Sequence, residues 1–391
     1  MRQISEREIE LPDSILGKLS EIASENKDII SISIGEPDFD APKPLINTIK
    51  KIASNYKKNK LSHYSAPSGR ADLKEAIIKK LKIKNKINST TDNILVTCGS
   101  QEAIFTGLLS TVDPSEEVIL PNPGYLGYLP AIDLVNGSPE FLKLEEENNF
   151  EINPDKIKEL ITKKTQVIIL NTPSNPTGTV LSRKILEEIA DIAREKNVYI
   201  FSDEAYEDLV YDKKHISIGS LNGMSDYVVS FYTFSKSYAM CGFRLGYAVG
   251  PKDLIEAMSK TSHYITLAPP TISQLVGIEA LKLPLRYIEQ MRKEYDRRRK
   301  FIVSRLNEIG LKTKMPQGAF YTFSNIKEIT KKSSLNFAKD LLNQAKVAVI
   351  PGSEFGNFGE GFIRCSYATK FELIEKAMDR IEKYLKSNHF K

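Results

Sequence analysis

The sequence has no tryptophan, only three cysteines and only four histidines among its 391 residues. Cys98, Cys241 and Cys365 are odd in number and far apart, which favours reduced thiols over a disulfide framework. The histidines show no metal-ligand spacing, so we expect no zinc site and no other metal. The chemistry of the chain must therefore come from other side chains.

Long apolar runs and a strong charge excess are also missing. No stretch reaches the length that a membrane span needs, and residues 1–23 lack the apolar core of a signal peptide. The net charge of +5 is small, and lysine runs such as residues 50–60 are interrupted, as on a solvated helix face. We therefore expect a cytoplasmic protein with small-molecule substrates that binds neither membranes nor nucleic acid.

Between residues 90 and 250, short apolar runs alternate with stretches of helical periodicity. Runs this short and this rich in Val and Ile are typical of buried strands in a mostly parallel sheet. The runs are residues 93–99, 117–123, 166–173, 198–204 and 227–235. The clearest helix between them is predicted over residues 182–197, with Ser182 as its N-cap. The fold class is therefore predicted as α/β.

The pattern changes near residue 285. A long charged helix is followed by short strands and a final helix near residues 371–386; the strands are predicted at residues 318–323, 347–352 and 362–369. The chain is long enough for two domains that share a cleft. We expect a large domain, residues 46–284, and a smaller α+β domain made of residues 1–45 and 285–391.

Polar residues follow the predicted strands, where ligands bind in open parallel sheets. Gly99, Ser100 and Gln101 follow the first run at the start of a predicted helix, where free N–H groups bind phosphate. The same residues serve equally well as an ordinary turn and cap. Asn175 follows the third run in NTPSNPTG, a loop stiffened by prolines, for which a solvated turn is the alternative.

The fourth and fifth runs also end in candidate site residues. Asp203 is either a helix N-cap or a carboxylate that keeps a partner nitrogen protonated, and Tyr206 follows it closely. Thr233, Ser235 and Lys236 end the fifth run. Burying an unpaired ammonium is costly, so this lysine either reaches outward or acts as a neutral nucleophile that forms Schiff bases.

Arg244 completes the set. It stays charged in any environment and, with the hydroxyls of Thr233 and Ser235, suits a phosphate group. A Schiff-base lysine, an acid for a ring nitrogen, a phosphate cup, an amide and a phenol are what a protein needs to hold pyridoxal 5′-phosphate.

Longer motifs show a family resemblance. The segment SFYTFSKSYAMCGFRLGY, residues 230–247, resembles the lysine signature of class I aminotransferases of the aspartate aminotransferase superfamily. IGEPDFD (34–40), HYSAPSGRADLKEAI (63–77), NTPSNPTG (171–178) and SDEAYEDLVY (202–211) resemble its other motifs. The similarity runs from about residue 28 to about residue 385 and is greatest to archaeal and bacterial aromatic and aspartate aminotransferases. It implies the fold type I architecture of pyridoxal-phosphate-dependent transferases.

The resemblance implies catalytic roles for matching positions. Lys236 would form the Schiff base with the cofactor and move a proton, and Asp203 would pair with the pyridine nitrogen. Tyr206 and Asn175 would hydrogen-bond the phenolic oxygen of the ring. Tyr125 would stack on the ring, at a position where many relatives have tryptophan.

The resemblance also implies how phosphate and substrate are held. The implied phosphate ligands are Gly99, Ser100, Gln101, Thr233, Ser235 and Arg244. Tyr64 would reach the phosphate of a neighbouring subunit, so the implied unit is a homodimer with shared active sites. Arg364 would grip the α-carboxylate of the substrate, with Gly35, Tyr125 and Asn175 beside it.

The implied activity is a ping-pong transfer of an amino group from an amino acid to 2-oxoglutarate. Some relatives that use aspartate carry a lysine in the helix after the phosphate cup, but residues 104–112 contain no cation. We therefore expect aromatic or broad specificity. Aspartate aminotransferase proper stays open, because another residue or a neighbouring chain can supply the cation. A carbon–sulfur lyase or decarboxylase on the same fold also stays open, whereas a regulator without catalysis would need an added DNA-binding domain.

Overall fold

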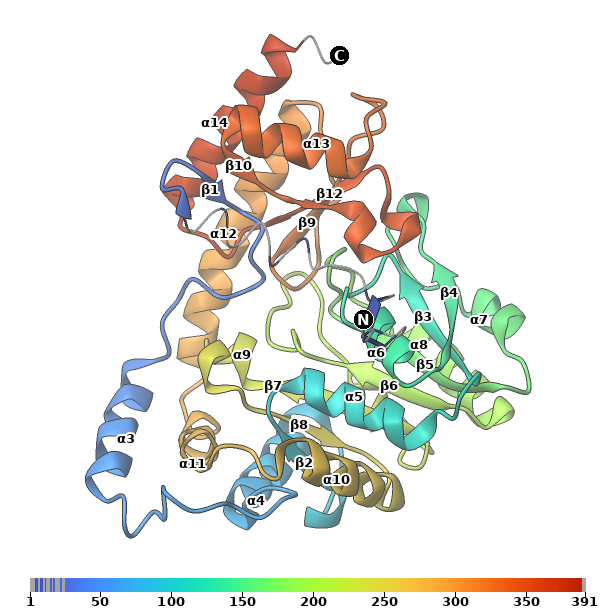
Figure 1. The fold of residues 1–391 in the computed structure, drawn as a ribbon, viewed down its shortest axis with the longest axis vertical. Coiled ribbons are helices and arrows are strands. Elements are labelled where there is room, and N and C mark those ends of the chain that lie inside the picture. Colours follow the sequence, from blue (N-terminus) through green and yellow to red (C-terminus); the bar gives the residue numbers. More distant parts are fainter. Residues whose placement is uncertain are drawn as a thin grey trace.

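The computed structural model describes residues 25–388 and, before them, positions 4, 5, 8, 9, 11, 15, 17 and 22 (Figure 1). Most of residues 1–24, which the sequence analysis assigns to the smaller domain, lie outside the described residues. None of the described helices is both long and apolar enough to cross a membrane.

A seven-stranded sheet forms the centre of the described structure, with strand order β2-β8-β7-β6-β5-β3-β4. Its strands are β2 (Ile94–Thr97), β3 (Glu117–Asn122), β4 (Ser138–Lys143), β5 (Thr165–Asn171), β6 (Tyr199–Asp203), β7 (Val228–Thr233) and β8 (Gly246–Val249). Only β8 runs antiparallel to its neighbours in this sheet. The five predicted strands and the α/β class are confirmed.

Two strands of this sheet were not predicted. β4 has the sequence SPEFLK and lies at the sheet edge, where most of its residues are only partly buried, so it lacks a continuous apolar run. β8 has the sequence GYAV, which is too short and too rich in small residues to stand out. Both strands are defined by their neighbours more than by their own composition.

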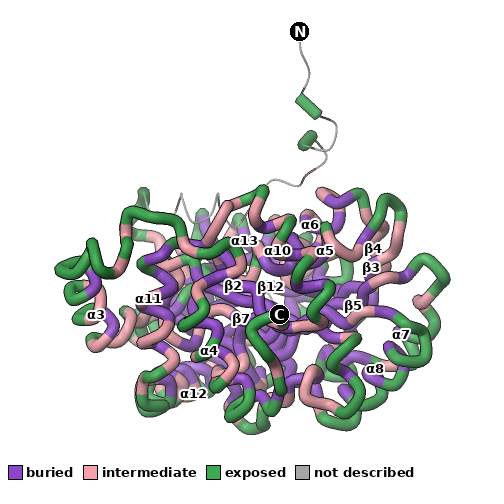
Figure 2. The backbone as a smooth tube through the Cα atoms, turned by 90° about the horizontal axis from the view of Figure 1, so that it is seen from below, coloured by how far each residue is buried: buried purple, intermediate pink, exposed green. Residues whose placement is uncertain are grey.

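Helices cover both faces of the sheet. One face carries α5 (Ser100–Thr111), α6 (Tyr128–Leu134) and α10 (Lys252–Thr266). The other carries α3 (Lys43–Ser54), α4 (Ala71–Lys80), α7 (Pro154–Leu160), α8 (Arg183–Lys196) and α11 (Thr271–Ala280). Strand residues alternate between these faces: Phe201 packs on the α5 side, whereas Ile200 packs on the α8 side. Figure 2 shows the resulting contrast between buried strands, such as β5 and β7, and the exposed outer surfaces of α7 and α8.

The helix predicted over residues 182–197 is α8. The Ser182 side chain accepts a hydrogen bond from the Ile185 N–H at 3.4 Å, so the predicted N-cap is confirmed. Leu186 and Ile189 are fully buried, as the helical spacing of the apolar residues predicts.

The C-terminal third of the chain contributes further helices and a separate antiparallel sheet. Its helices are α12 (Arg286–Glu308), α13 (Ser334–Asp340) and α14 (Phe371–Ser387). An antiparallel sheet has the order β11-β12-β9, with β9 (Tyr321–Asn325), β11 (Ile350–Pro351) and β12 (Phe362–Ser366). The segment 347–352, predicted as one strand, is divided between β10 (Val347–Ala348) and β11, because β10 pairs in parallel with β1 (Ile30–Ser31).

Short helical turns join these elements. They are η1 (Leu81–Asn85), η2 (Thr91–Asn93), η3 (Glu146–Asn148), η4 (Ile218–Ser220), α9 (Phe234–Ser237), η5 (Cys241–Phe243), η6 (Leu341–Ala345), η7 (Gly352–Phe355) and η8 (Asn357–Gly359).

Gly246 brings β8 against the turn that begins α5. A Cβ atom at this position would lie 2.6 Å from the backbone carbonyl carbon of Gly99 and 2.6 Å from the backbone nitrogen of Ser100. Since both atoms belong to the backbone, no side-chain rotation relieves the clash.

We expect Gly246→Ala to lower the thermal unfolding midpoint, because overpacking of this kind costs about 1–3 kcal/mol. The matched control is Gly242→Ala, since a Cβ at Gly242 would meet nothing within 4 Å. Equal midpoints for the two variants, measured by calorimetry, would show that the turn has room to move.

Candidate active site

A cavity of about 310 Å³, here called the central cavity, lies beyond the carboxyl ends of β5, β6 and β7. Its lining includes most of the predicted site residues: Gly35, Ser100, Gln101, Tyr125, Asn175, Asp203, Tyr206, Thr233, Ser235, Lys236, Arg244 and Arg364. Gly99 is not part of the lining, but it directly precedes the lining residue Ser100 and is the N-cap of α5. Tyr64 is not part of the lining and is 83% exposed.

Asp203 is the last residue of β6 and is buried. Its Oδ2 accepts a hydrogen bond from the Tyr128 hydroxyl at 2.6 Å, and its Oδ1 accepts one from the Ala205 N–H at 3.1 Å. Burial raises the pKa of Asp203 to about 6, although the hydrogen bond from Tyr128 and the charge of Lys236 act in the opposite direction. The carboxyl group therefore holds a proton far more readily than an exposed aspartate does.

Lys236 lies on α9, directly after β7. Its Nζ donates a hydrogen bond to the Gly35 carbonyl at 2.6 Å and lies 5.9 Å and 5.8 Å from the ring centroids of Tyr206 and Phe320. Within the described part of the chain, no carboxylate forms an ion pair with it. The amine therefore lies at the cavity beside a carbonyl oxygen and two aromatic rings, and no acid among the described residues is paired with it.

One end of the central cavity is suited to an anion. Gly99, with φ of 86°, is the N-cap of α5 and has no side chain that could cap the helix. The first N–H groups of α5, which have no intrahelical partner, therefore stay available for a ligand. The Arg244 guanidinium lies against Gly99, where a Cβ would be 2.7 Å from Nη2. Thr233 and Ser235 add hydroxyl groups whose oxygens are 3.0 Å apart. A helix N-terminus, a guanidinium and hydroxyls together favour phosphate.

Arg364, on β12, supplies a second cation at another wall of the cavity. Its side chain is almost completely buried; Nη1 donates to the Asn175 Oδ1 at 3.0 Å and Nη2 donates to the Ser33 carbonyl at 2.6 Å. Its Nε has no hydrogen-bond partner, and no carboxylate of residues 25–388 forms an ion pair with it. Burial lowers the pKa of Arg364, yet an arginine keeps its charge in proteins. A buried guanidinium without an acid partner is suited to a carboxylate ligand.

Sequence reasoning missed three residues of the site. The Tyr321 hydroxyl lies 2.8 Å from that of Tyr206, and the Tyr321 ring lies under the Arg364 guanidinium at 4.3 Å. Tyr128 bonds Asp203, and the Asn171 amide oxygen accepts from the Asn175 N–H at 2.7 Å. The sequence could have indicated two of these residues: Tyr128 follows Tyr125 by about one helical turn, and Asn171 lies at the end of a predicted strand. It gave no indication of Tyr321, because the partners of Tyr321 are distant in sequence.

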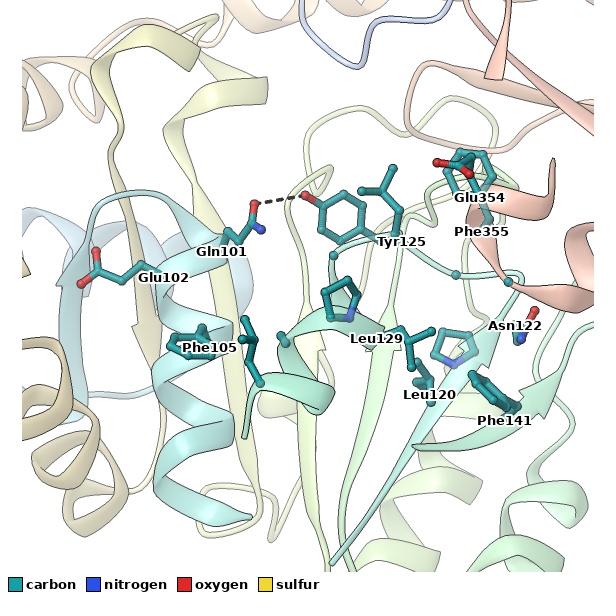
Figure 3. Close-up of a pocket in the computed structure, with 18 of the residues that line it drawn as sticks. Gln101, Glu102, Phe105, Leu120, Asn122, Tyr125, Leu129, Phe141, Glu354 and Phe355 are labelled. Atoms are coloured by element: carbon teal, nitrogen blue, oxygen red, sulfur yellow. Dashed lines mark hydrogen bonds between the residues drawn. The ribbon is translucent and has the colours of Figure 1, made fainter. Parts of the chain in front are cut away.

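A larger cavity of about 570 Å³, here called the side cavity, adjoins the first and shares Gln101, Tyr125 and Leu126 with it. Figure 3 shows the Tyr125 hydroxyl donating to the Gln101 Oε1, at 3.3 Å, along the shared wall. The lining of the side cavity is mostly apolar and includes Phe105, Leu120, Leu129, Pro130, Phe141 and Ile265. Among the described residues, no lysine, arginine or histidine lines it.

Known proteins that are similar to this chain identify its family. The model of the family "Aminotransferase class I and II" matches residues 27–381. The chain belongs to this family. The fold type I architecture that the sequence motifs imply is confirmed, and the protein is an aminotransferase.

This aminotransferase is similar to archaeal enzymes along nearly its whole length. It is 45% identical to an aspartate aminotransferase of Pyrococcus abyssi, covering 95% of this chain and 96% of the relative. It is 43% identical to aromatic-amino-acid aminotransferase 2 of Thermococcus litoralis, with the same coverage. The solved structure of an aromatic aminotransferase from Pyrococcus horikoshii matches with a TM-score of 0.90 and 42% identity, covering 95% of this chain and 99% of that one.

The raised pKa of Asp203 predicts how the stability of this aminotransferase, prepared without cofactor, depends on pH. The folded-state pKa of about 6 lies above the unfolded value of about 3.9, so only the folded chain holds this proton at pH 4–6. The stabilisation is present below about pH 4 and is lost as pH rises through 6. From pH 4 to 7 the parent should lose roughly 2–3 kcal/mol relative to Asp203→Asn.

Unfolding of both proteins across this pH range measures the difference. The exposed Asp113, changed to Asn, is the matched control and should leave the parent curve unchanged. Parallel curves for the parent and Asp203→Asn would contradict the environment described for Asp203.

Proposed function

We propose that this aminotransferase uses pyridoxal 5′-phosphate to transfer the amino group of aromatic or diverse amino acids to 2-oxoglutarate. The observation that carries the proposal is the buried guanidinium of Arg364. It has no acid partner among the described residues and shares one cavity with Lys236 and Asp203. An α-carboxylate at Arg364 would satisfy the free Nε, because a guanidinium binds carboxylates as a fork.

The residues present fit the cofactor. The anion-binding end suits its phosphate, through Gly99, Ser100, Gln101, Thr233, Ser235 and Arg244. Asp203 suits its ring nitrogen, because a buried carboxylate opposite that nitrogen stabilises its protonated form. Tyr125 offers a ring face for stacking, and Tyr206 and Asn175 offer polar groups on the same cavity wall. When bound, this group supplies the electron sink for a carbanion at the substrate Cα.

The chain itself supplies orientation and proton transfer. Arg364 would hold the carboxylate of the amino acid and then that of the oxo acid, since both carry this group in the same place. The Lys236 amine would move the proton from the Cα of the amino acid to the cofactor, and in the second half-reaction it would move a proton back from the cofactor to the Cα of the oxo acid. Because one cavity serves both half-reactions, the two substrates would bind in turn.

The side cavity supports an aromatic or broad preference. It is mostly apolar, adjoins the central cavity and has no cationic side chain among its described lining residues, which include the acids Glu102 and Glu354. An aromatic side chain buries much apolar area in such a space, whereas a second carboxylate would be unpaired there. Aspartate specificity is the second candidate, because the relatives include an aspartate aminotransferase and a neighbouring subunit can provide a cation.

A homodimer accounts for the position of Tyr64, which is 83% exposed and outside the cavity lining of its own chain. We propose that Tyr64 completes the phosphate site of a second copy.

We also propose a large domain of residues 46–284 and a small domain of residues 1–45 and 285–391. The pairing of β1 with β10 supports this division, because it joins the N-terminal segment to the C-terminal part of the chain. Three free cysteines support a cytoplasmic location.

The half-reaction tests transamination directly. Incubated with phenylalanine alone, the cofactor-loaded protein should form about one equivalent of the oxo acid per subunit and no ammonia. Adding 2-oxoglutarate should then restore the original visible spectrum. A carbon–sulfur lyase, given a suitable thioether substrate, would instead turn over continuously and release ammonia.

Two lysine variants complete this experiment. Lys236→Ala should abolish the half-reaction, because the proton-transferring amine is lost. Lys252→Ala changes an exposed lysine and should behave as the parent. A Lys236→Ala protein that reacts at the parent rate would contradict the assigned role.

Substrate preference should respond to a cation at the wall between the cavities. We expect Gln101→Lys to raise the ratio of kcat/KM for aspartate over phenylalanine by roughly 10- to 100-fold, the value of one charge-assisted hydrogen bond. Gln101→Met, of similar length but uncharged, is the control and should not raise the ratio. An unchanged ratio in Gln101→Lys would place the second carboxylate elsewhere.

A further inference from the structure

A second buried carboxylate lies one residue beyond Asp203, on the other face of the sheet. Glu204 is fully buried. Successive side chains alternate across a strand, so Asp203 bonds Tyr128 on the α6 side while Glu204 bonds Ser202 on the opposite side. The role proposed for Asp203 does not use this neighbour.

Hydrogen-bond donors surround the Glu204 carboxylate. Its Oε1 accepts from the Ser202 Oγ at 3.0 Å and the Ser217 Oγ at 2.7 Å. Its Oε2 accepts from the Tyr232 hydroxyl at 2.9 Å and lies 2.8 Å from the His215 Nε2. Four such contacts match the acceptor-only pattern of an ionised carboxylate. Of the four partners, only His215 can carry a positive charge.

The nearby lysines pair with other acids. The Lys80 Nζ lies 2.5 Å from Glu207, and the Lys84 Nζ lies 2.6 Å from Asp208 and 3.2 Å from Glu207. Burial alone would raise the pKa of Glu207, but the two lysines hold it well below its usual range. The charges of Glu207 and Asp208 are thus balanced by Lys80 and Lys84.

The same pairing argues against a metal site. Oxygens of Glu204 and Glu207 and a ring nitrogen of His215 lie within 4.8 Å of one another. However, Glu207 already accepts hydrogen bonds from Lys80 and from the Asn85 amide at 2.7 Å. The cluster is therefore a balanced ion network with one remaining carboxylate, Glu204.

We propose that Glu204, oriented by His215, is a positioning residue that strengthens the hold of Asp203 on the protonated ring nitrogen of the cofactor. The proposal rests on the function proposed above. A fixed negative charge in a low-dielectric interior attracts a nearby cation, here the protonated ring nitrogen, and makes a neighbouring carboxylate a stronger hydrogen-bond acceptor. Burial is the largest cause of the raised pKa of Asp203, and the charge of Glu204 acts in the same direction.

His215 determines whether the negative charge of Glu204 acts on Asp203. Its side chain is buried, and its Nδ1 has no hydrogen-bond partner among the described residues. The contact between the His215 Nε2 and the Glu204 Oε2 orients the carboxylate, whereas a fixed cation in place of the imidazole would cancel the charge of Glu204. The two residues thus form one electrostatic unit behind Asp203.

The test compares two ligands that differ only at the ring nitrogen. Calorimetric titration of cofactor-free protein measures affinity for pyridoxal phosphate and for its analogue with C–H in place of that nitrogen. Glu204→Gln removes the charge and keeps the side-chain shape. We expect about tenfold weaker binding of pyridoxal phosphate and binding of the analogue unchanged within about twofold.

Two further variants guard against misfolding. His215→Lys keeps Glu204 but adds a fixed cation, and should weaken pyridoxal phosphate selectively as Glu204→Gln does. Ser217→Ala removes one hydrogen bond without removing charge, and should leave the ratio of the two affinities at the parent value.

Equal weakening of both ligands in Glu204→Gln and His215→Lys would show a purely structural role and overturn the proposal. Unchanged affinities would show that the charge is already cancelled, and would overturn it too. A parent protein that fails to bind pyridoxal phosphate would instead refute the proposed function.

Discussion

The in-register parallel pairing of β5, β6 and β7 is the constraint on which the site depends. Asn171 at the end of β5 is paired with Asp203 at the end of β6, and Asp203 is paired with Phe231 on β7. The carboxyl ends of these strands therefore meet at one edge. A rigid amide-bearing loop, a buried acid and the turn with Lys236 are brought together there without any long excursion of the chain. A shift of one residue in the register of β6 would turn Asp203 to the other face of the sheet.

The site combines cations that lack acid partners within the described structure. Arg364 is bonded to an amide and a carbonyl, Lys236 to a carbonyl, and Arg244 to the Cys241 carbonyl at 2.9 Å. By contrast, Arg299, which is as buried as Arg364, pairs with Asp212 and Asp296. Arg299 therefore contributes to the fold through its ion pairs, whereas Arg364 keeps its charge available for an anionic ligand. A phosphate and a carboxylate are anions of the required kind.

Much of this arrangement could be predicted from the sequence, because its signals are local. The runs that became β5, β6 and β7 are apolar enough to be recognised, and the polar residues after them are those that line the cavity. The remainder depends on contacts between distant residues. The hydroxyl pair of Tyr206 and Tyr321 joins the turn after β6 to β9, and only the folded chain shows it. Likewise, Glu204 looks like part of a surface turn until its four partners are seen.

The central claim is that one amine, that of Lys236, carries the cofactor covalently. Borohydride reduction of the cofactor-loaded protein, followed by proteolysis and mass spectrometry, tests it most directly. The account predicts a stable pyridoxyl phosphate label on the peptide that contains Lys236 and on no other lysine peptide in stoichiometric amount. A stoichiometric label on a different lysine, such as Lys80, or no label at all, would contradict it.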